Sequence, residues 1–355
     1  MTTIAFHSNQ LSLRGTETAL FDYATFNQKL LGNESIILYP KKSVTNNTEA
    51  VRKFESKFLT LPYTDFSEVD HLIRSHHAES LYAIKSGEID GIVSSVVPTM
   101  VHAVFPVLEV NYHGSAFAFV SDWLSKVFSN NKVPSVPHMV HLPDTADDLR
   151  RELRIPTDAL VFGCYGGRDS FDILFVKDIV IPEVVKRRKD IYFIFLNIDK
   201  FVEHSRVIFL PASADMHHKV RFINTTDAML HARKLGESFG LACGEFSIRN
   251  KPIITYGKSK QRSHLTILGG NAFGYTDSTS LLSIIFNFDR NLIASKNWDF
   301  YSSAFSPASV MERFDKYFIR TAARNGLVQH PGLRIGISDK IQRAISLLDI
   351  QRLRL

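Results

Sequence analysis

Short apolar runs of strand length alternate with longer amphipathic segments along most of the chain. Runs such as TIAFHSN, SIILYP, SLYAIKSG and ALVFGCYGG are nearly continuous in apolar residues, which is typical of strands buried on both faces. Helix-length segments lie between them. In one of these, RGTETALFDYATFNQKLLG, Thr16 and Thr18 are candidate N-caps and Gly32 follows the last turn. The alternation predicts βα units on mostly parallel sheets, and therefore an α/β fold.

A proline-rich stretch interrupts the alternation. Pro134, Pro137 and Pro143 lie among short extended pieces, and Pro156 follows a charged segment, Asp147–Leu153, that we expect to be a short helix. Apolar strand-length runs then resume, and we expect KVRFIN to be a strand or the approach to one. Two doubly wound, Rossmann-like domains, 1–140 and 141–305, follow from this pattern. In such sheets ligands bind beyond the carboxyl ends of the strands, so we expect a ligand in a cleft between the domains.

The last part of the chain has a different pattern. Residues 306–355 contain helix-length segments, which we expect to pack back on the N-terminal domain. The final one, SDKIQRAISLLDIQRLRL, has apolar residues at helical spacing together with basic residues. Peripheral contact with a membrane surface and packing on the protein body are both open for this helix.

Composition narrows the class of protein. The chain has 355 residues, with 42 basic and 36 acidic ones, and a net charge of +6. The basic residues are scattered, so nothing indicates nucleic-acid binding. The start, MTTIAFHSNQ, has no signal-peptide pattern, and Cys164 and Cys243 are expected to be buried free thiols rather than a disulfide. These features predict a cytoplasmic protein, and no cluster of residues has metal-ligand spacing.

The segment HARKLGESFGLACGEFSIRNKPIITYG contains the most informative pattern of the sequence. Glu237 and Glu245 are separated by seven residues. If Ser238 is the N-cap of a helix, Glu245 lies on the same face as this cap and ~10 Å further along the axis. Both carboxylates could be solvated helix charges, or both could accept hydrogen bonds from a ligand.

The start of this predicted helix is suited to an anion. It would offer the free backbone N–H groups of Phe239, Gly240 and Leu241 and the positive end of the helix dipole. A phosphate seated there would have a carboxylate on either side, and carboxylates bind vicinal hydroxyls through strong hydrogen bonds. A ligand with hydroxyls on both sides of a diphosphate is a nucleotide sugar.

This segment resembles the donor site of glycosyltransferases with the GT-B fold, in particular the retaining family-4 group. That pattern is a strand, then E-x-F/S-G-x-x-x-x-E, then a strand beginning x-P-V/I-I. Weaker similarities occur in the same order in RGTETALFDYA, TMVHAVFP, FAFVSDWLS and RELRIPTDALVFGCYGGRDSF. The resemblance covers most of residues 1–320 and implies two Rossmann-like domains of the GT-B type.

The resemblance implies roles for individual residues. Glu237 would contact the transferred sugar, His102 would face that sugar from the other domain, and Arg168 would neutralise the leaving diphosphate. The remaining donor contacts that it implies are Gly15 and Thr16 at the first loop, the backbone of Ser238, Phe239, Gly240 and Leu241, and Glu245 at the ribose diol.

One position departs from the family pattern. Ile173 stands where the family usually has a lysine that meets the diphosphate. Lys177, Arg233 or Lys234 would have to supply this charge, because without a metal the departing diphosphate needs cations. Readings without a ligand-binding role stay open for two positions: His102 could be a core histidine and Arg168 a solvated loop charge. His113 is a further, weaker candidate for ligand binding.

The implied activity is retaining, metal-independent transfer of a hexose-type sugar from a nucleoside diphosphate sugar to a glycan, a lipid-linked glycan or another hydroxyl acceptor. It needs no cofactor beyond its substrates. Two alternatives share the fold. One is a nucleotide-sugar epimerase, and the other is a catalytically silent protein that binds nucleotides or glycans, which the isoleucine at position 173 would favour.

Overall fold

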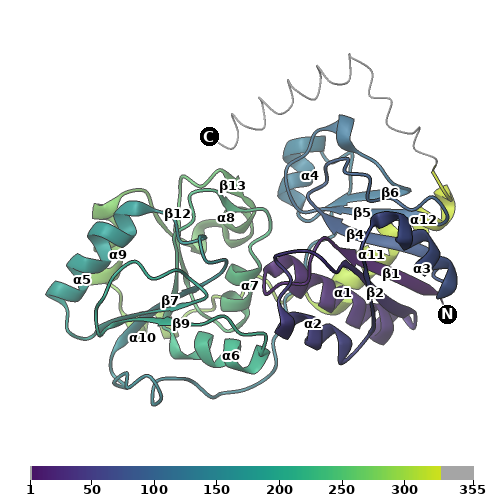
Figure 1. Ribbon diagram of the computed structural model, residues 1–355. Helices are drawn as coiled ribbons and strands as arrows, with labels where there is room; N and C mark the ends of the chain where they lie inside the picture. Colours follow the sequence, from purple (N-terminus) through teal and green to yellow (C-terminus); the bar gives the residue numbers. More distant parts are fainter. Residues whose placement is uncertain (1, 329–355) are drawn as a thin grey trace. The chain divides into compact units, whose positions relative to one another are not determined.

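The computed structural model describes residues 2–328, which form two compact units. The first unit contains the residues up to Met139 and those from Pro307 onward, and the second is Val140–Ser306. Each unit is built on a six-stranded sheet with helices packed around it (Figure 1). The helix predicted within SDKIQRAISLLDIQRLRL lies outside the described residues.

The sheet of the first unit is entirely parallel and has the strand order β3-β2-β1-β4-β5-β6. Its strands are β1 (Thr3–Ser8), β2 (Glu34–Pro40), β3 (Leu59–Tyr63), β4 (Ser80–Lys85), β5 (Thr99–Ala103) and β6 (Ala116–Phe119). The helices of this unit are α1 (Gly15–Leu31), α2 (Thr48–Glu55), α3 (Val69–Ser75), α4 (Asp122–Ser129), α11 (Pro307–Phe314) and α12 (Arg320–Asn325). Short 3₁₀ turns lie at η1 (Phe66–Glu68) and η2 (Glu109–Asn111), and a π-helical segment, η5 (Asp315–Ile319), joins α11 to α12.

The second unit repeats this plan with the order β14-β12-β10-β7-β8-β9, again all parallel. Its strands are β7 (Leu160–Tyr165), β8 (Ile191–Leu196), β9 (Val207–Leu210), β10 (Ala228–His231), β12 (Ile253–Tyr256) and β14 (Phe273–Tyr275), and a separate pair joins β11 (Gly236–Glu237) to β13 (Gln261–Arg262). Its helices are α5 (Ile181–Arg187), α6 (Met216–Thr225), α7 (Leu241–Ile248), α8 (Ser263–Leu268), α9 (Ser278–Phe286) and α10 (Arg290–Ala294), with a π-helical segment η3 (Val176–Val180) and a 3₁₀ turn η4 (Gly269–Asn271).

Counted along the chain, each sheet has the order 3-2-1-4-5-6, which is the Rossmann arrangement of a doubly wound fold. The predicted α/β class is therefore confirmed for both halves. The chain returns to the first unit at its C-terminal side, where α11 packs beside α1 (Figure 1). Phe314 of α11 stacks on Tyr23 of α1, with ring centroids 5.2 Å apart, and both side chains are fully buried.

Three local predictions were wrong. KVRFIN belongs to helix α6, which the Asp215 side chain caps by accepting a hydrogen bond from the His217 N–H. The segment Asp147–Leu153 is not a helix: its second half is a turn with one i+4 hydrogen bond, from the Leu153 N–H to the Leu149 carbonyl at 2.9 Å, and the Ile155 N–H then bonds to the Arg150 carbonyl at 2.8 Å. Helix α1 begins at Gly15, ahead of both candidate caps, and has no side-chain cap. Its predicted end is confirmed, since Gly32 adopts a left-handed conformation with φ of 67°.

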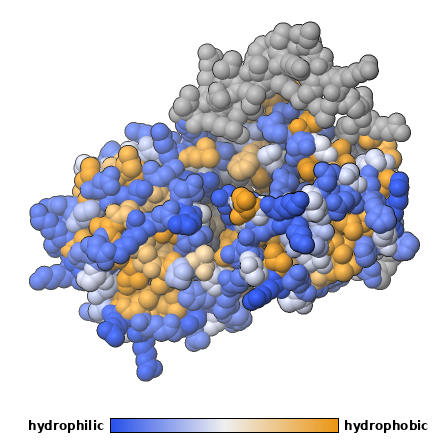
Figure 2. Space-filling view, in the orientation of Figure 1, coloured by the Kyte–Doolittle hydropathy of each residue, from blue (hydrophilic) through white to orange (hydrophobic). Residues whose placement is uncertain are grey.

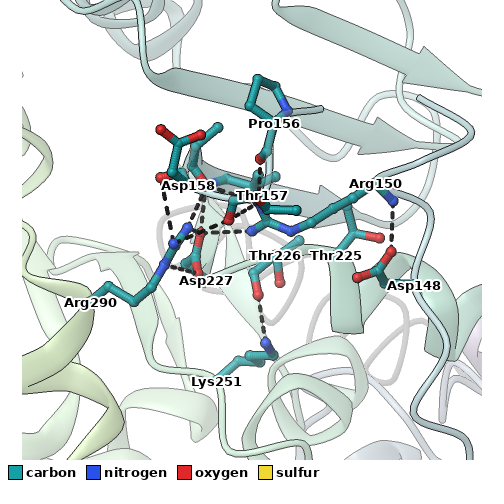
Figure 3. Close-up of polar contacts among 12 residues, drawn as sticks. Asp148, Arg150, Pro156, Thr157, Asp158, Thr225, Thr226, Asp227, Lys251 and Arg290 are labelled. Atoms are coloured by element: carbon teal, nitrogen blue, oxygen red, sulfur yellow. Dashed lines mark hydrogen bonds and ion pairs between the residues drawn. The ribbon is translucent and has the colours of Figure 1, made fainter. Parts of the chain in front are cut away.

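A buried ionic cluster fastens the amino-terminal edge of the second sheet (Figure 3). Asp227 lies immediately before β10, and its side chain is only 12% exposed. Its carboxylate accepts hydrogen bonds from the Val161 N–H at 2.8 Å, from Arg150 at 3.2 Å and from Arg290 at 2.9 and 3.0 Å. Strand β7, the loop before it and helix α10 are therefore tied to one carboxylate.

The two arginines of this cluster also satisfy backbone carbonyls of the incoming loop. The Arg150 guanidinium donates to the carbonyl oxygens of Pro156 at 3.0 Å and Ala159 at 2.9 Å, and Arg290 also donates to the latter. Such a cluster stabilises the fold only when every charge is paired, because a lone buried charge is costly.

Asp227→Ala is expected to lower the free energy of unfolding by about 3 kcal/mol, since it leaves two arginines without their opposite charge and a strand N–H without its acceptor. Urea unfolding at pH 7 measures this loss. Asp190→Ala is the matched control: it breaks an Arg–Asp pair whose carboxylate side chain is 48% exposed, and should cost less than about 1 kcal/mol. Equal losses in the two variants would contradict the bracing role of Asp227.

On the face seen in Figure 2, hydrophobic patches lie between hydrophilic areas. Exposed large apolar side chains include Val44, Leu174 and Ile179. Among residues 2–328, no helix has the length and apolar character needed to cross a bilayer. Cys164 and Cys243 are buried and free, as predicted.

Candidate functional site

The carboxyl ends of three neighbouring strands bring polar side chains together in the second unit. Strand β7 ends at Tyr165, β10 at His231, and β12 carries Thr255 next to its last residue. Because the strands are parallel, these ends lie on one edge of the sheet. The segment with the two glutamates follows β10 directly, so this edge holds the candidate site.

The two glutamates are not carried by one helix, which corrects the prediction from spacing. Glu237 belongs to the short strand β11, paired with β13, and only Glu245 lies on α7. Helix α7 begins at Leu241, and its N-cap is Gly240 rather than Ser238. The helix ends at Ile248, and Asn250 just beyond it has a positive φ of 55°.

Gly240 explains why the helix starts where it does. Its φ is +92°, a conformation that residues with a side chain rarely adopt. A Cβ there would also lie 2.9 Å from the Cβ of His264 and 3.5 Å from the Tyr301 hydroxyl. The backbone therefore turns sharply between Glu237 and Leu241, and it leaves the first N–H groups of α7 without acceptors inside the helix.

Glu237 is held by two donors that bind the same oxygen. Arg233 Nη1 lies 3.0 Å and His231 Nε2 3.2 Å from Oε1, while no described residue donates a hydrogen bond to Oε2. Burial alone would raise the pKa of this carboxyl, but the Arg233 charge and the His231 hydrogen bond outweigh it and lower the pKa to about 2. The side chain is 21% exposed, so an ionised carboxylate is partly accessible to solvent at neutral pH.

Glu245 lies deeper, with its side chain only 3% exposed. Lys219 of α6 contacts both of its oxygens, with Nζ 3.0 Å from Oε1 and 3.3 Å from Oε2. The Tyr165 hydroxyl also donates to Oε2, and the Lys219 ammonium lies 5.3 Å from the centre of the Tyr165 ring. This carboxylate is therefore fully engaged within the protein.

Lys219 and Tyr165 were missed by sequence reasoning. The expectation that KVRFIN is a strand or the approach to one hides the position of Lys219 one turn inside a helix capped by Asp215. Tyr165 is the last residue of a correctly predicted strand, but nothing in the sequence shows that its hydroxyl meets Glu245. The capping residue Asp215 is the one signal that would have corrected the first error.

The predicted cations have different surroundings. Arg168 is 79% exposed at its side chain and pairs with Asp199 at 2.7 Å, and Lys177 lies over the Phe201 ring at 5.8 Å. Arg233 is paired with Glu237. Ile173 is a buried core residue, which accounts for the absence of a lysine at that position.

Three further donor-site candidates differ in how buried they are. The Phe239 side chain is buried against Tyr301 and Phe305, at centroid distances of 5.9 and 5.1 Å, so it presents only its backbone. In the first unit, Gly15 is exposed and Thr16 is partly exposed at the start of α1.

His102 occupies the core of the first unit. It has no exposed surface, its Nδ1 lies 2.6 Å from the Tyr82 hydroxyl, and the rings of Tyr23 and Phe318 pack against it at centroid distances of 5.6 and 5.2 Å. Burial lowers its pKa well below the usual histidine value. This placement fits the alternative of a core histidine, and a contact with a sugar stays a prediction.

Other buried polar groups lie at the same sheet. The Glu17 carboxylate accepts from Ser8 at 3.3 Å and from Ser12 at 2.5 Å, and so orders the loop that ends at Gly15. His113 binds Lys85 through Nε2 at 3.0 Å and the Asn111 carbonyl through Nδ1 at 2.6 Å.

Known structures similar to this chain identify its fold class. No protein-family model matches the chain, and no curated protein matches it in sequence. Anabaena HepE in complex with UDP and glucose superposes with a TM-score of 0.68 at 14% identity, covering 89% of this chain and 99% of that one. A glycosyltransferase from Rickettsia africae gives 0.61 at 12% identity, covering 91% and 96%.

A protein from Listeria monocytogenes assigned as a UDP-N-acetylglucosamine 2-epimerase also superposes, with a TM-score of 0.56 at 9% identity over 89% of this chain and 96% of that one. Transferases and an epimerase thus share one architecture. With its two parallel sheets of Rossmann order, the chain has the GT-B fold.

Acidification is expected to destabilise the first unit through its buried histidines. Burial is the main cause that lowers the pKa of His7 and His138 to about 3, and that of His102 well below its usual value. Between about pH 6.5 and 3 the unfolded chain therefore binds more protons, so stability rises with pH in that window and is lost as pH falls. Each histidine contributes up to about 1.4 kcal/mol per pH unit.

His102→Gln should reduce this slope, measured as the free energy of urea unfolding from pH 7 to pH 5. The exposed His71 provides the control, since His71→Gln should leave the slope unchanged. A slope in His102→Gln equal to that of the unaltered protein would show that this ring does not need to shed a proton on folding.

Proposed function

We propose that the protein is a glycosyltransferase that moves a sugar from a nucleoside diphosphate sugar to an acceptor hydroxyl. The observation that carries the proposal is the placement of Glu237 and Glu245 on either side of the start of α7, at the carboxyl edge of a Rossmann-like sheet. The GT-B fold, which HepE bound to UDP-glucose also has, supports it.

The start of α7 supports a diphosphate site. The N–H groups of its first turn, beginning at Leu241, have no acceptors within the helix, and the helix dipole adds positive potential there. The left-handed turn at Gly240 leaves no Cβ between this backbone and a ligand. Ser238 lies in the same turn and would add its backbone N–H or hydroxyl.

Glu237 is suited to accept hydrogen bonds from sugar hydroxyls rather than to donate a proton. Its lowered pKa keeps it ionised at neutral pH, Oε1 is fixed by Arg233 and His231, and Oε2 is left to a ligand. Such a carboxylate binds a hydroxyl through a charge-assisted bond. It therefore positions the sugar without acting as a general acid.

Glu245 is proposed to bind the ribose diol, with Tyr165 and Lys219 as neighbours in the nucleoside pocket. A diol would share or replace the contacts that these two residues now make with the carboxylate. Lys219 pairs with Glu245 and Arg233 with Glu237, the two glutamates that flank the start of α7. We propose that these two cations meet the negative charge of the diphosphate, with Arg168 and Lys177 as further candidates.

We further propose a retaining, metal-independent reaction of a hexose-type sugar. The bond between the anomeric carbon and the diphosphate oxygen breaks, and the diphosphate leaves with the electron pair. The acceptor oxygen bonds to the same face of that carbon, and its proton passes to the departing phosphate oxygen. The protein contributes orientation and electrostatic stabilisation of the leaving group.

An epimerase of the same fold is the second candidate, supported by the Listeria neighbour. It would convert a nucleotide sugar into an isomer without an acceptor. A silent binding protein is the third candidate, supported by the burial of Ile173 in place of a lysine. The acceptor is proposed to be a glycan or lipid-linked glycan, and peripheral membrane contact stays a proposal.

A melting-temperature screen against nucleotide sugars should identify the donor, because ligand binding to the native state raises the melting temperature. With the donor found, Glu237→Gln is expected to lower turnover by about 10²–10³-fold, as for the loss of one transition-state contact. Glu245→Gln should mainly raise the KM for the donor. Glu203→Gln, at an exposed glutamate of the same unit, is the control and should change neither parameter.

Full turnover in both glutamate variants would refute the site. Release of an isomerised nucleotide sugar without acceptor would favour the epimerase, and stabilisation without any turnover would favour the silent binding protein.

A further inference from the structure

A continuous chain of polar side chains runs from Glu237 into the interior of the second unit. His231 bonds to Glu237 Oε1 through Nε2 at 3.2 Å and to the Thr255 hydroxyl through Nδ1 at 2.8 Å. The Thr255 hydroxyl in turn lies 3.0 Å from Nε2 of His264. Three elements contribute to this chain: β10, β12 and α8.

The inner part of the chain is shielded from solvent. Thr255 and His264 have no exposed surface, and His231 is 3% exposed. The far nitrogen of the inner ring, Nδ1 of His264, is buried and has no hydrogen-bond partner among the described residues. A buried polar atom without a partner is costly, so its presence at the end of a polar chain requires an explanation.

Counting protons along the chain gives that explanation. The ionised Glu237 only accepts, so Nε2 of His231 carries a proton and donates it. When His231 is neutral, its Nδ1 must accept, and the single hydroxyl proton of Thr255 points to it. The Thr255 oxygen then accepts from Nε2–H of His264, and the unpartnered Nδ1 of His264 is a bare lone pair, which is less costly than an unpaired N–H. The chain thus has one consistent direction when both rings are neutral.

Hydrogen bonds that run in the opposite direction, from His231 to His264, would cost more free energy. This arrangement requires a charged His231 that donates to Thr255, which donates to Nε2 of His264 and leaves an N–H at Nδ1 buried without an acceptor. Burial, followed by the electrostatic effect of His231, lowers the pKa of His264 to about 3, so that ring does not take up a proton near neutrality.

We propose that His231, Thr255 and His264 form a relay of positioning residues that fixes the Nε2–H tautomer of His231 and thereby the orientation of Glu237 toward the donor sugar. None of the three contacts the sugar in this arrangement. The inference rests on the proposed function of Glu237, and it adds residues outside the glutamate motif to the donor site.

Charged and titratable groups face the relay from several elements. Arg233 lies at its outer end, Arg262 of β13 interacts with His264, and the Tyr275 hydroxyl donates to the His231 carbonyl at 3.0 Å. Further inward, Cys164 and Cys243 interact electrostatically with Glu237, and burial raises the pKa of both thiols. Asp169 and Asp172 act on Arg233. Among these neighbours, Arg233, His231 and His264 lower the pKa of Glu237 and so favour its ionised form, which the relay then orients.

Thr255→Val tests the relay, because valine keeps the shape and strand preference of threonine while removing the hydroxyl. Turnover should fall about tenfold, the effect of one net hydrogen bond, with little change in the KM for the donor. Thr255→Ser should restore turnover. Thr226→Val is the control: it removes another buried hydroxyl of this unit, which bonds only to the Ile223 carbonyl.

A second readout needs no activity. In the ligand-free protein with ¹⁵N-labelled histidine, the ring shifts should report Nε2–H tautomers for His231 and His264. In Thr255→Val, His231 keeps its Nε2–H through Glu237 but its Nδ1 shift changes with the loss of the hydroxyl, and His264 should become a mixture of tautomers. The proposal is overturned if the ring shifts of Thr255→Val match those of Thr226→Val, or if the two variants have the same measurable turnover. Absence of donor turnover in the unaltered protein would count against the transferase activity, while the tautomer measurement still decides the relay.

Discussion

Each glutamate of the candidate site is paired with a cation of its own, and the rest of the site depends on this pairing. Arg233 holds Glu237 and Lys219 holds Glu245, so two largely buried carboxylates are neutralised before any ligand arrives. Without these partners, burial would protonate the carboxylates or unfold the segment. With them, the protein can keep two anionic groups beside a helix start that favours a third anion. An incoming diphosphate would compete for the same cations, which links donor binding to the state of both glutamates.

The amino-terminal edge of the second sheet stabilises the fold, whereas its carboxyl edge holds the candidate site. At the amino-terminal edge, Asp227 and its two arginines close a network in which every charge is used by the fold. At the carboxyl edge, Glu237 keeps one oxygen that no described residue binds, and Gly240 leaves backbone groups accessible. The stabilising ion pairs thus lie at the amino-terminal edge, while the groups that are left free to bind a ligand lie at the carboxyl edge. This division is expected for parallel sheets, whose ligands bind beyond the carboxyl ends of the strands.

The sequence predicted the α/β class, most strands and the glutamate segment, because continuous apolar runs and the cap at Gly32 are local signals. It did not predict that Glu237 lies outside the helix, since that depends on the left-handed turn at Gly240 and its close approach to His264. His102 shows a second limit: every residue of β5 is buried, so a strand pattern cannot tell a core side chain from one that faces a ligand. Lys219 was missed because a six-residue apolar and polar run fits a strand and a helix equally well.

The central claim is that a nucleoside diphosphate sugar binds at the start of α7 between the two glutamates. Hydrogen–deuterium exchange with and without UDP-glucose, the nucleotide sugar present in the HepE complex, tests it directly. The account predicts slower amide exchange on ligand addition in residues 236–248, greatest at the first turn of α7, with little change at β9 or α10. Binding of UDP-glucose or another nucleotide sugar that leaves exchange in 236–248 unchanged would contradict it.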